Sequence, residues 1–225
     1  MRGTVTRLQR QQRRKTRVNV FLDEEYAFSL EEITAAELQQ GQVLEERDIE
    51  HLLRRDGANR AQERALSLLE VRPRSRRELE QRLRRAGYEA AAIVEALDRL
   101  ERVELVDDAA FARFWVEQRL TFRPRSRRAL QYELRRRGVS GQALEEALAP
   151  VDDAQAAEDL ARRHLERMTG REDQEAVRER LYRLLRNRGF DHSTTKSVLD
   201  SLESWDSQQH SENEPERLDH SGEDE

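Results

Sequence analysis

The chain has 225 residues, of which 39% are charged and 5% aromatic, and its formal net charge is −5. So much charge leaves too little apolar mass for one large globular core, but enough for stacked amphipathic helices. The chain has no cysteine, which excludes disulfides and thiolate metal sites, and no apolar run approaches the ~18 residues of a membrane span. We therefore expect a cytoplasmic, mainly helical protein.

Charge is sorted along the chain. The first seventeen residues contain seven Arg or Lys and no acid, whereas residues 204–225 contain eight acids and one base, Arg217. Neither end shows apolar periodicity, and such polar, charged segments remain unfolded because they bury too little apolar surface. The sequence predicts a disordered basic arm over residues 1–17 and a disordered acidic tail over residues 204–225.

Two short runs of β-branched and aromatic residues follow the basic arm. They cover residues 18–22 and 26–30, and this pattern predicts a β-hairpin. Short helices are expected over residues 31–39 and 45–55, with Gly41 and Gly57 as stops. Because an isolated hairpin is only marginally stable, we expect residues 18–60 to form one small mixed module.

An internal repeat of 51 residues dominates the rest of the chain. Segment 73–88 returns as segment 124–139 with ten of sixteen residues identical. A weaker third copy keeps the same spacing at Leu181, Leu185, Arg186 and Gly189, and departs at Thr195, where the earlier copies have apolar residues. A unit of this size cannot close a core alone, so it packs against its neighbours.

Each copy of the repeat fits three helices separated by turns. The apolar residues recur at helical spacing, and Gly87, Gly138 and Gly189 follow predicted helix ends, where a left-handed residue is favoured. Paired aspartates at 107–108 and 152–153 fit the caps that open the next triplets. We expect a mainly α fold, with three tandem three-helix repeats (61–105, 106–151 and 152–203) forming an elongated curved body behind the hairpin and helix module.

The second copy holds most of the aromatic residues. Phe111, Trp115 and Phe122 recur at helical spacing, which favours burial between helices, whereas Phe114 fits this pattern least well. The alternative is that these rings form a stacking surface for nucleic-acid bases.

Arginines are the candidate binding residues. With the leucines of each middle helix facing inward, one arginine face projects outward, and other arginines surround the helix amino termini, where the macrodipole disfavours cations. Free N–H groups beside guanidinium groups would receive phosphate or carboxylate. The alternative is a solvated face of i,i+4 ion pairs, which Arg76 and Glu80 can form, whereas Arg127 and Arg128 lack an acid at i+4. The candidate partner-binding or phosphate-binding residues are Arg74, Arg76, Arg77, Arg84, Arg85, Arg125, Arg127, Arg128, Arg135, Arg136 and Arg186.

The sequence predicts no catalytic chemistry. The five histidines are scattered without the spacing of a helical metal site, and no glycine-rich phosphate loop is present. The paired aspartates lie where helix caps are expected. We therefore expect no enzyme activity, no metal and no cofactor.

The chain resembles the RecX regulators of the bacterial recombinase RecA. The resemblance covers residues 15–203 and rests on the repeated blocks 74–87 and 125–138, the junction 105–112 and the hairpin 17–30. It implies a protein that binds in the helical groove of the RecA filament on single-stranded DNA. Such a protein would limit filament growth and suppress the ATPase, strand-exchange and co-protease activities that serve homologous recombination and the SOS response.

Two other functions fit the residues. Helical triplets with arginines at helix starts could dock directly on DNA, mainly through phosphate contacts, and such binding would weaken steeply with salt. A helical scaffold unrelated to DNA is the third possibility, supported only by the acidic segments. In each case we expect a monomer without membrane contact.

Overall fold

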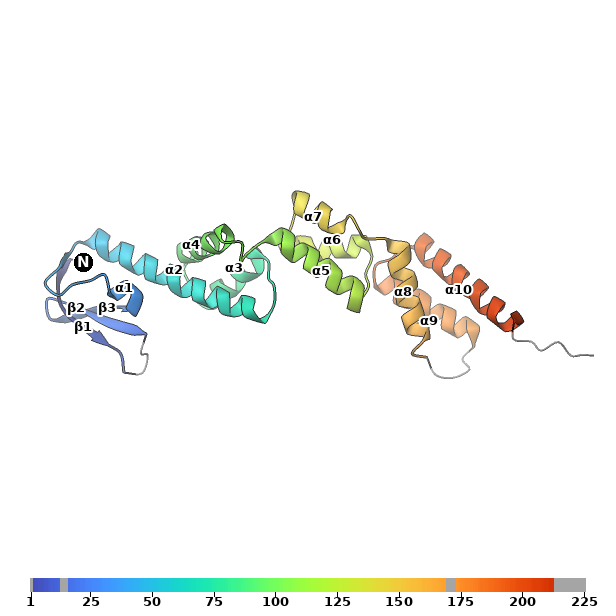
Figure 1. Ribbon diagram of the computed structural model, residues 1–225, viewed down its shortest axis with the longest axis horizontal. Helices are drawn as coiled ribbons and strands as arrows, with labels where there is room; N and C mark the ends of the chain where they lie inside the picture. The colour runs from blue at the N-terminus through green and yellow to red at the C-terminus, as the bar shows by residue number, and fades with distance from the viewer. Residues whose placement is uncertain (1, 13–15, 169–172, 213–225) are drawn as a thin grey trace, which may run out of the picture. The chain divides into compact units, whose positions relative to one another are not determined.

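The computed structural model describes residues 2–12, 16–168 and 173–212, the last ten of them by backbone alone (Figure 1). The protein is mainly helical with a small amino-terminal sheet, as predicted. The chain divides into two compact units: Met1–Phe111 with Arg137–Val139, and Ala112–Arg136 with Ser140–Glu225. Across the described residues, none of the helices is both long and apolar enough to cross a membrane.

The amino-terminal module of unit 1 is a four-stranded antiparallel sheet in the order β3-β2-β1-β4. Its strands are β1 (Gly3–Arg10), β2 (Arg17–Leu22), β3 (Glu25–Glu31) and β4 (Val43–Leu44). The predicted hairpin is confirmed as β2 and β3, with a tight turn in which Asp23 and Glu24 have positive φ. Apolar residues at alternate positions, such as Val18 and Val20, face the core of the module.

The disorder predicted for residues 1–17 is wrong for β1, which pairs with β2 and β4. Residues 4–6 are the β-branched run Thr-Val-Thr and Leu8 follows, a composition typical of strands that the basic charge obscured. Val5 is fully buried, and the Arg7 guanidinium lies 3.9 Å from the centre of the Phe21 ring. The arginines of this strand therefore belong to a folded sheet.

A buried ionic cluster joins the sheet to the helix that follows it. Arg17 is 9% exposed and Asp56 is 3% exposed, and an Arg17 nitrogen lies 3.4 Å from an Asp56 oxygen. The other Asp56 oxygen accepts the backbone N–H of Glu31 at 2.5 Å. Burial, followed by the nearby charges of Glu63 and Asp56, raises the pKa of the Glu31 carboxyl.

The two helices expected around Gly57 are one continuous helix, α2 (Glu46–Val71), and the helix expected over 31–39 is the single turn α1 (Glu32–Ala35). Gly57 is a close-contact residue in α2 and not a stop. A Cβ added there would lie 3.4 Å from the Cβ of Ala92. Together with three fully buried alanines of α2, at positions 58, 61 and 65, Gly57 lets α4 (Ala90–Arg102) pack closely.

The helices after the module fall into three successive triplets. The carboxyl half of α2 joins α3 (Arg76–Arg85) and α4; α5 (Asp108–Phe122) is followed by α6 (Arg127–Arg136) and α7 (Gly141–Leu148); α8 (Asp153–Leu165) is followed by α9 (Gln174–Asn187) and α10 (His192–Glu212). The middle helix of each triplet buries two leucines, and every one of these is at most 3% exposed: Leu79, Leu83, Leu130, Leu134, Leu181 and Leu185.

The carboxyl end of the helical region differs from the prediction. Helix α10 continues to Glu212, so disorder over residues 204–212 is wrong, while residues 213–225 lie outside the described part of the chain. Thr195 keeps the core position of its apolar counterparts. It is fully buried, and its hydroxyl donates to the carbonyl of Asp191 at 2.7 Å. This back-bond satisfies the hydroxyl, so a polar residue is tolerated in the core.

The aromatic residues of the second triplet separate into buried and exposed positions. Phe111 is 2% exposed, as expected for a core residue, and Phe114 and Trp115 are partly buried. The burial predicted for Phe122 is wrong, because 70% of it is exposed at the end of α5. Phe122 is the last residue of α5.

In each unit, the serine at the start of a middle helix donates a hydrogen bond to the backbone carbonyl of an arginine. In unit 1 the Ser75 hydroxyl donates to the carbonyl of Arg137 at 2.6 Å, and in unit 2 the Ser126 N–H donates to the carbonyl of Arg188 at 3.2 Å. Both contacts join residues 62 positions apart. We call them the unit 1 joint and the unit 2 joint.

The glycines that follow the middle helices are part of these joints. Gly138 has φ +92°, and an added Cβ would lie 2.7 Å from the Cβ of Arg77. Gly189 has φ +93°, and an added Cβ would lie 2.8 Å from the hydroxyl of Ser126. Glycine therefore serves both the left-handed helix end and the close approach of the segments that meet at each joint.

Candidate functional site

The amino termini of α3 and α6 are bonded by the protein's own carboxylates. Asp107 and Asp152 cap their own helices, and the second aspartate of each pair reaches another helix. Asp108 accepts the N–H of Arg76 at 2.8 Å, and Asp153 accepts the N–H of residue 127 at 2.6 Å. Burial raises the pKa of Asp108, although the N–H bond opposes this shift. The N–H groups of residues 76 and 127, which the sequence suggested were free for an outside anion, are therefore occupied.

Two of the candidate arginines in unit 1 have partners within the fold. Arg74 is 7% exposed, and its Nε donates to the carbonyl of Leu68 at 2.9 Å. Burial is the main cause of its lowered pKa. Arg76 pairs with Asp98 at 2.7 Å and with Glu101 at 2.5 Å. These partners offset the unfavourable interaction of the two cations with the amino terminus of α3.

Three further candidates, in unit 2, also make contacts within the fold. Arg125 lies 3.1 Å from a Glu133 oxygen, and Arg127 donates to the carbonyl of Leu148 at 3.0 Å. Arg186 donates at 2.7 Å to the backbone carbonyl four residues further along the chain. These contacts tie helix ends together, so part of the role of each side chain is structural.

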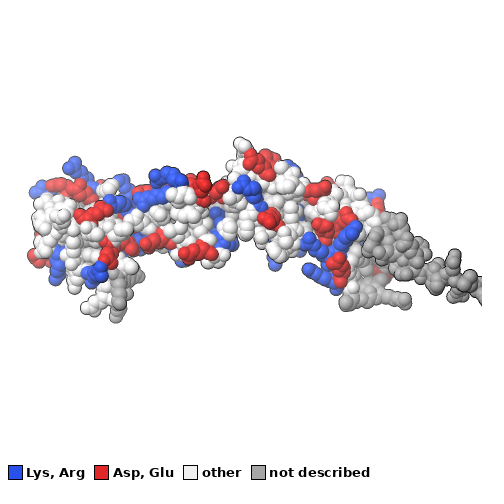
Figure 2. Space-filling model, in the orientation of Figure 1, with Lys and Arg blue, Asp and Glu red and all other residues white. Residues whose placement is uncertain are grey.

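The remaining candidates are exposed on the middle helices. Arg84 forms an i,i+4 ion pair with Glu80, and Arg136 lies 5.7 Å from the centre of the Tyr132 ring. The others make no ion pair or side-chain hydrogen bond with any described residue. Among the candidates, we call the exposed arginines that form no ion pair with a described residue the open arginines: Arg77 and Arg85 on α3, and Arg128, Arg135 and Arg136 on α6. Figure 2 shows that, on the face in view, Lys and Arg gather in patches bordered by acids.

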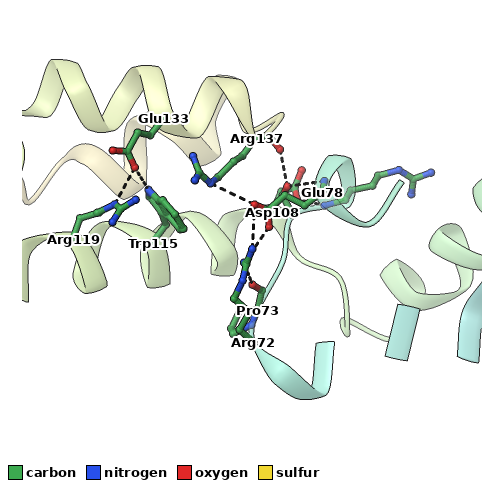
Figure 3. A network of polar contacts seen from close by, with 10 residues as sticks. Arg72, Pro73, Glu78, Asp108, Trp115, Arg119, Glu133 and Arg137 are labelled. Atoms are coloured by element: carbon green, nitrogen blue, oxygen red, sulfur yellow. Dashed lines mark hydrogen bonds and ion pairs between the residues drawn. The ribbon is translucent and has the colours of Figure 1, made fainter. Parts of the chain in front are cut away.

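The unit 1 joint contains two arginines that sequence reasoning did not select. One carboxylate, Glu78, holds both of them (Figure 3). Its oxygens lie 3.1 Å from Arg72 and 3.5 Å from Arg137. These residues lie on the segments that form the Ser75–Arg137 contact of the joint, so the ion pairs support it.

The carboxylate of unit 2 is Glu133, which is bound differently (Figure 3). It accepts the indole N–H of Trp115 at 2.8 Å and lies 2.9 Å from Arg119 and 3.1 Å from Arg125. The Arg119 guanidinium also lies 4.3 Å from the centre of the Trp115 ring. This carboxylate is only 12% exposed and has three nitrogen partners.

Two more arginines complete this part of unit 2. Arg123 is exposed directly after α5, and Arg188 follows α9 at the joint. Burial lowers the pKa of Arg188, and the positive charges of Arg125, Arg123 and Arg119 lower it further. The repeat spacing was a signal for these residues, because Arg123 and Arg188 stand 51 positions after Arg72 and Arg137.

Helical triplets behind a strand module define a helical-repeat protein. Within the described ranges, no group of three or more His, Asp or Glu side chains is arranged to hold a metal. Three family models match the chain: the RecX N-terminal domain over residues 3–45, the first three-helix domain over 61–100 and the second over 107–148. The chain belongs to the RecX family of regulatory proteins.

Individual relatives agree with the family models. The chain is 37% identical over 143 residues to the regulatory protein RecX of Prosthecochloris aestuarii, which covers 64% of this chain and 93% of that protein. It is 40% identical over 140 residues to that of Mycolicibacterium smegmatis, which covers 60% and 74%. A crystal structure of regulatory protein RecX matches with a TM-score of 0.63 at 23% identity, over 88% of this chain and 99% of that one, and shows the same fold.

Proposed function

We propose that this protein binds the filament that RecA forms on single-stranded DNA and limits its growth, its ATPase and its recombinase and co-protease activities. The observation that carries this proposal is membership of a regulatory family together with open arginines on the middle helices of the first two triplets. In this proposal the protein acts in the cytoplasm as a monomer, without enzyme activity or cofactor.

Repeated charged contacts suit a repetitive partner. The middle helices α3 and α6 each carry a stripe of arginines. Positions 77 and 85 lie within about one quarter-turn of each other on α3, and so do positions 128 and 135 on α6. Several weak contacts made by one chain raise the effective concentration of the later ones, so affinity does not need a deep pocket. Arg186, in the third triplet, bonds to its own backbone, so the first two triplets carry the proposed contact.

The decisive experiment is the ATPase rate of RecA on single-stranded DNA, titrated with this protein at physiological salt. Inhibition at less than one molecule per RecA protomer supports the proposal. The test variant changes the open arginines of α6 (Arg128, Arg135 and Arg136) to Ser and should lose inhibition while keeping its helicity. A charge-matched control changes Arg47, Arg162 and Arg183, which are exposed on other helices, and should keep inhibition.

Direct DNA binding is the second candidate, favoured by the exposed Phe122 and by Arg123, which follows it in the sequence. The two functions respond differently to salt. A binder that acts through phosphates loses orders of magnitude in affinity between 50 and 200 mM salt, roughly 10³-fold for six contacts. If inhibition of RecA falls in parallel with affinity for naked DNA, competition for DNA replaces filament regulation as the function.

A further inference from the structure

The two joints have the same residues at corresponding positions, with one exception. The sequence Arg-Pro-Arg-Ser-Arg-Arg occurs at 72–77 and again at 123–128, and Arg137 of the unit 1 joint corresponds to Arg188 of the unit 2 joint. The acid is not repeated. Glu78, which holds Arg72 and Arg137, corresponds to Ala129 in unit 2.

Glu133 of unit 2 does not replace the acid that is missing at position 129. Glu133 occupies the position that corresponds to Arg82, and its oxygens are engaged by Trp115, Arg119 and Arg125. Arg123 and Arg188 therefore form no ion pair with a carboxylate of the described chain. The second copy of the repeat therefore has the arginines of the joint without the acid that pairs with them in the first copy.

Counting charges shows that this cluster lacks an anion. Four guanidinium groups interact here, because the charges of Arg119, Arg123 and Arg125 act on Arg188, while Arg119 and Arg125 pair with one carboxylate, Glu133. The carboxyl end of α5 adds about half a negative charge from its macrodipole, and Arg163 already donates to the carbonyl of Thr121 there. Roughly two and a half positive charges remain. Burial lowers the pKa of Arg188, and the charges of Arg125, Arg123 and Arg119 lower it further.

We propose that Arg123 and Arg188 form a binding site for a phosphate group of a single nucleic-acid strand. Guanidinium groups bind phosphate oxygens in pairs, and the Glu133 carboxylate holds the neighbouring arginines in place. Phe122, adjacent in sequence to Arg123 and 70% exposed, offers a ring on which a base can stack. An acidic protein segment would use the charges but not the ring, so the exposed aromatic favours nucleic acid.

The test restores the missing acid. In Ala129→Glu the new side chain lies three residues after the Ser126 cap, as Glu78 does after Ser75, so it can pair with Arg123 and Arg188 as Glu78 pairs with Arg72 and Arg137. Ala129→Gln has nearly the same size without the charge. Binding of a labelled oligo(dT) at 100 mM salt should weaken about tenfold in the Glu variant, and the slope of log affinity against log salt should fall by about 0.7 per lost phosphate contact. The Gln variant should bind as the parent does.

Two further variants keep the proposal testable if Ala129→Glu folds poorly. Arg123→Gln removes an exposed side chain that forms no ion pair, and should weaken oligo(dT) binding without changing the melting temperature. Phe122→Ala should weaken binding of oligo(dT) about tenfold but leave binding of an abasic strand unchanged, because only the stacking contact is lost.

Equal affinities of the Glu and Gln variants, with both folded, would overturn the site. A Phe122→Ala variant with unchanged oligo(dT) affinity, combined with full displacement of the strand by a poly-glutamate peptide, would instead identify an acidic protein segment as the occupant and overturn the nucleic-acid assignment. The binding assay contains no RecA. Loss of RecA inhibition and loss of strand binding are therefore separate results.

Discussion

Replacing Gly189 by Ala tests whether the unit 2 joint exists in solution, and Gly87 provides the matched control. Both glycines follow helices with nearly the same backbone, φ +93° at Gly189 and φ +86° at Gly87. Only their surroundings differ. An added Cβ at Gly189 would lie 2.8 Å from the Ser126 hydroxyl and 2.9 Å from the Cβ of Ala129, whereas nothing lies within 4 Å of one at Gly87.

The expected losses follow from these distances. A left-handed alanine costs about 1 kcal/mol at either position. Overpacking at Gly189 adds roughly 1–3 kcal/mol, because both close atoms belong to short side chains next to the backbone of the α6 amino terminus. Gly87→Ala should therefore cost about 1 kcal/mol and Gly189→Ala about 2–4 kcal/mol.

Hydrogen exchange read by mass spectrometry measures each loss locally, which is necessary because a chain with two units does not unfold in one step. Amides at the end of α3 should exchange about fivefold faster in Gly87→Ala. Amides at the end of α9 and the start of α6 should exchange together, about 30- to 700-fold faster in Gly189→Ala. Equal effects of the two substitutions would refute the joint, and with it the position of Arg188 beside the other arginines.

Three further predictions concern other parts of the molecule. Asp56→Ala leaves Arg17 buried without its closest acid and should destabilise the sheet by about 3–5 kcal/mol, seen as faster exchange of β2 and β3 amides; unchanged exchange would contradict a buried pair. Hydrogen bonds from Thr194 and Ser193 lower the pKa of Asp191, so its capping of α10 should be complete above about pH 4 and lost as the pH falls further, and Asp191→Asn should remove this part of the melting profile. Glu133→Gln should move the tryptophan emission toward longer wavelength, because the carboxylate that fixes Trp115 and Arg119 is lost; an unchanged spectrum of the folded variant would count against that network.

The repeats were predictable because their signals are local. The buried leucines recur at helical spacing, and the closing glycines mark helix ends at a fixed distance, so three triplets followed from the sequence. Gly57 misled the prediction, since a glycine in a helix can be a stop or a close contact. Only Ala92, packed against it from another helix, decides between these roles.

The ion pairs of the arginines were not predictable to the same extent. The i,i+4 partner of Arg84 can be read from the chain, but Arg76 pairs with acids 22 and 25 residues away. Arg137 pairs with Glu78, which lies more than one whole repeat earlier in the chain. Such distant contacts decide which arginines are left without an ion pair. The exchange of Glu78 for Ala129, in contrast, is visible when the repeats are aligned.

The 62-residue span of each joint also sets an order for folding during synthesis. The start of α3 receives its hydroxyl contact only once Arg137 has been made, and the start of α6 waits for Arg188. At about 5–20 residues per second, a ribosome supplies these partners roughly 3–12 seconds after the helices that need them. Each of the first two triplets therefore leaves the ribosome before the arginine that completes its joint has been made. A ribosome stalled before Arg188 would hold a chain in which the unit 2 joint has not formed.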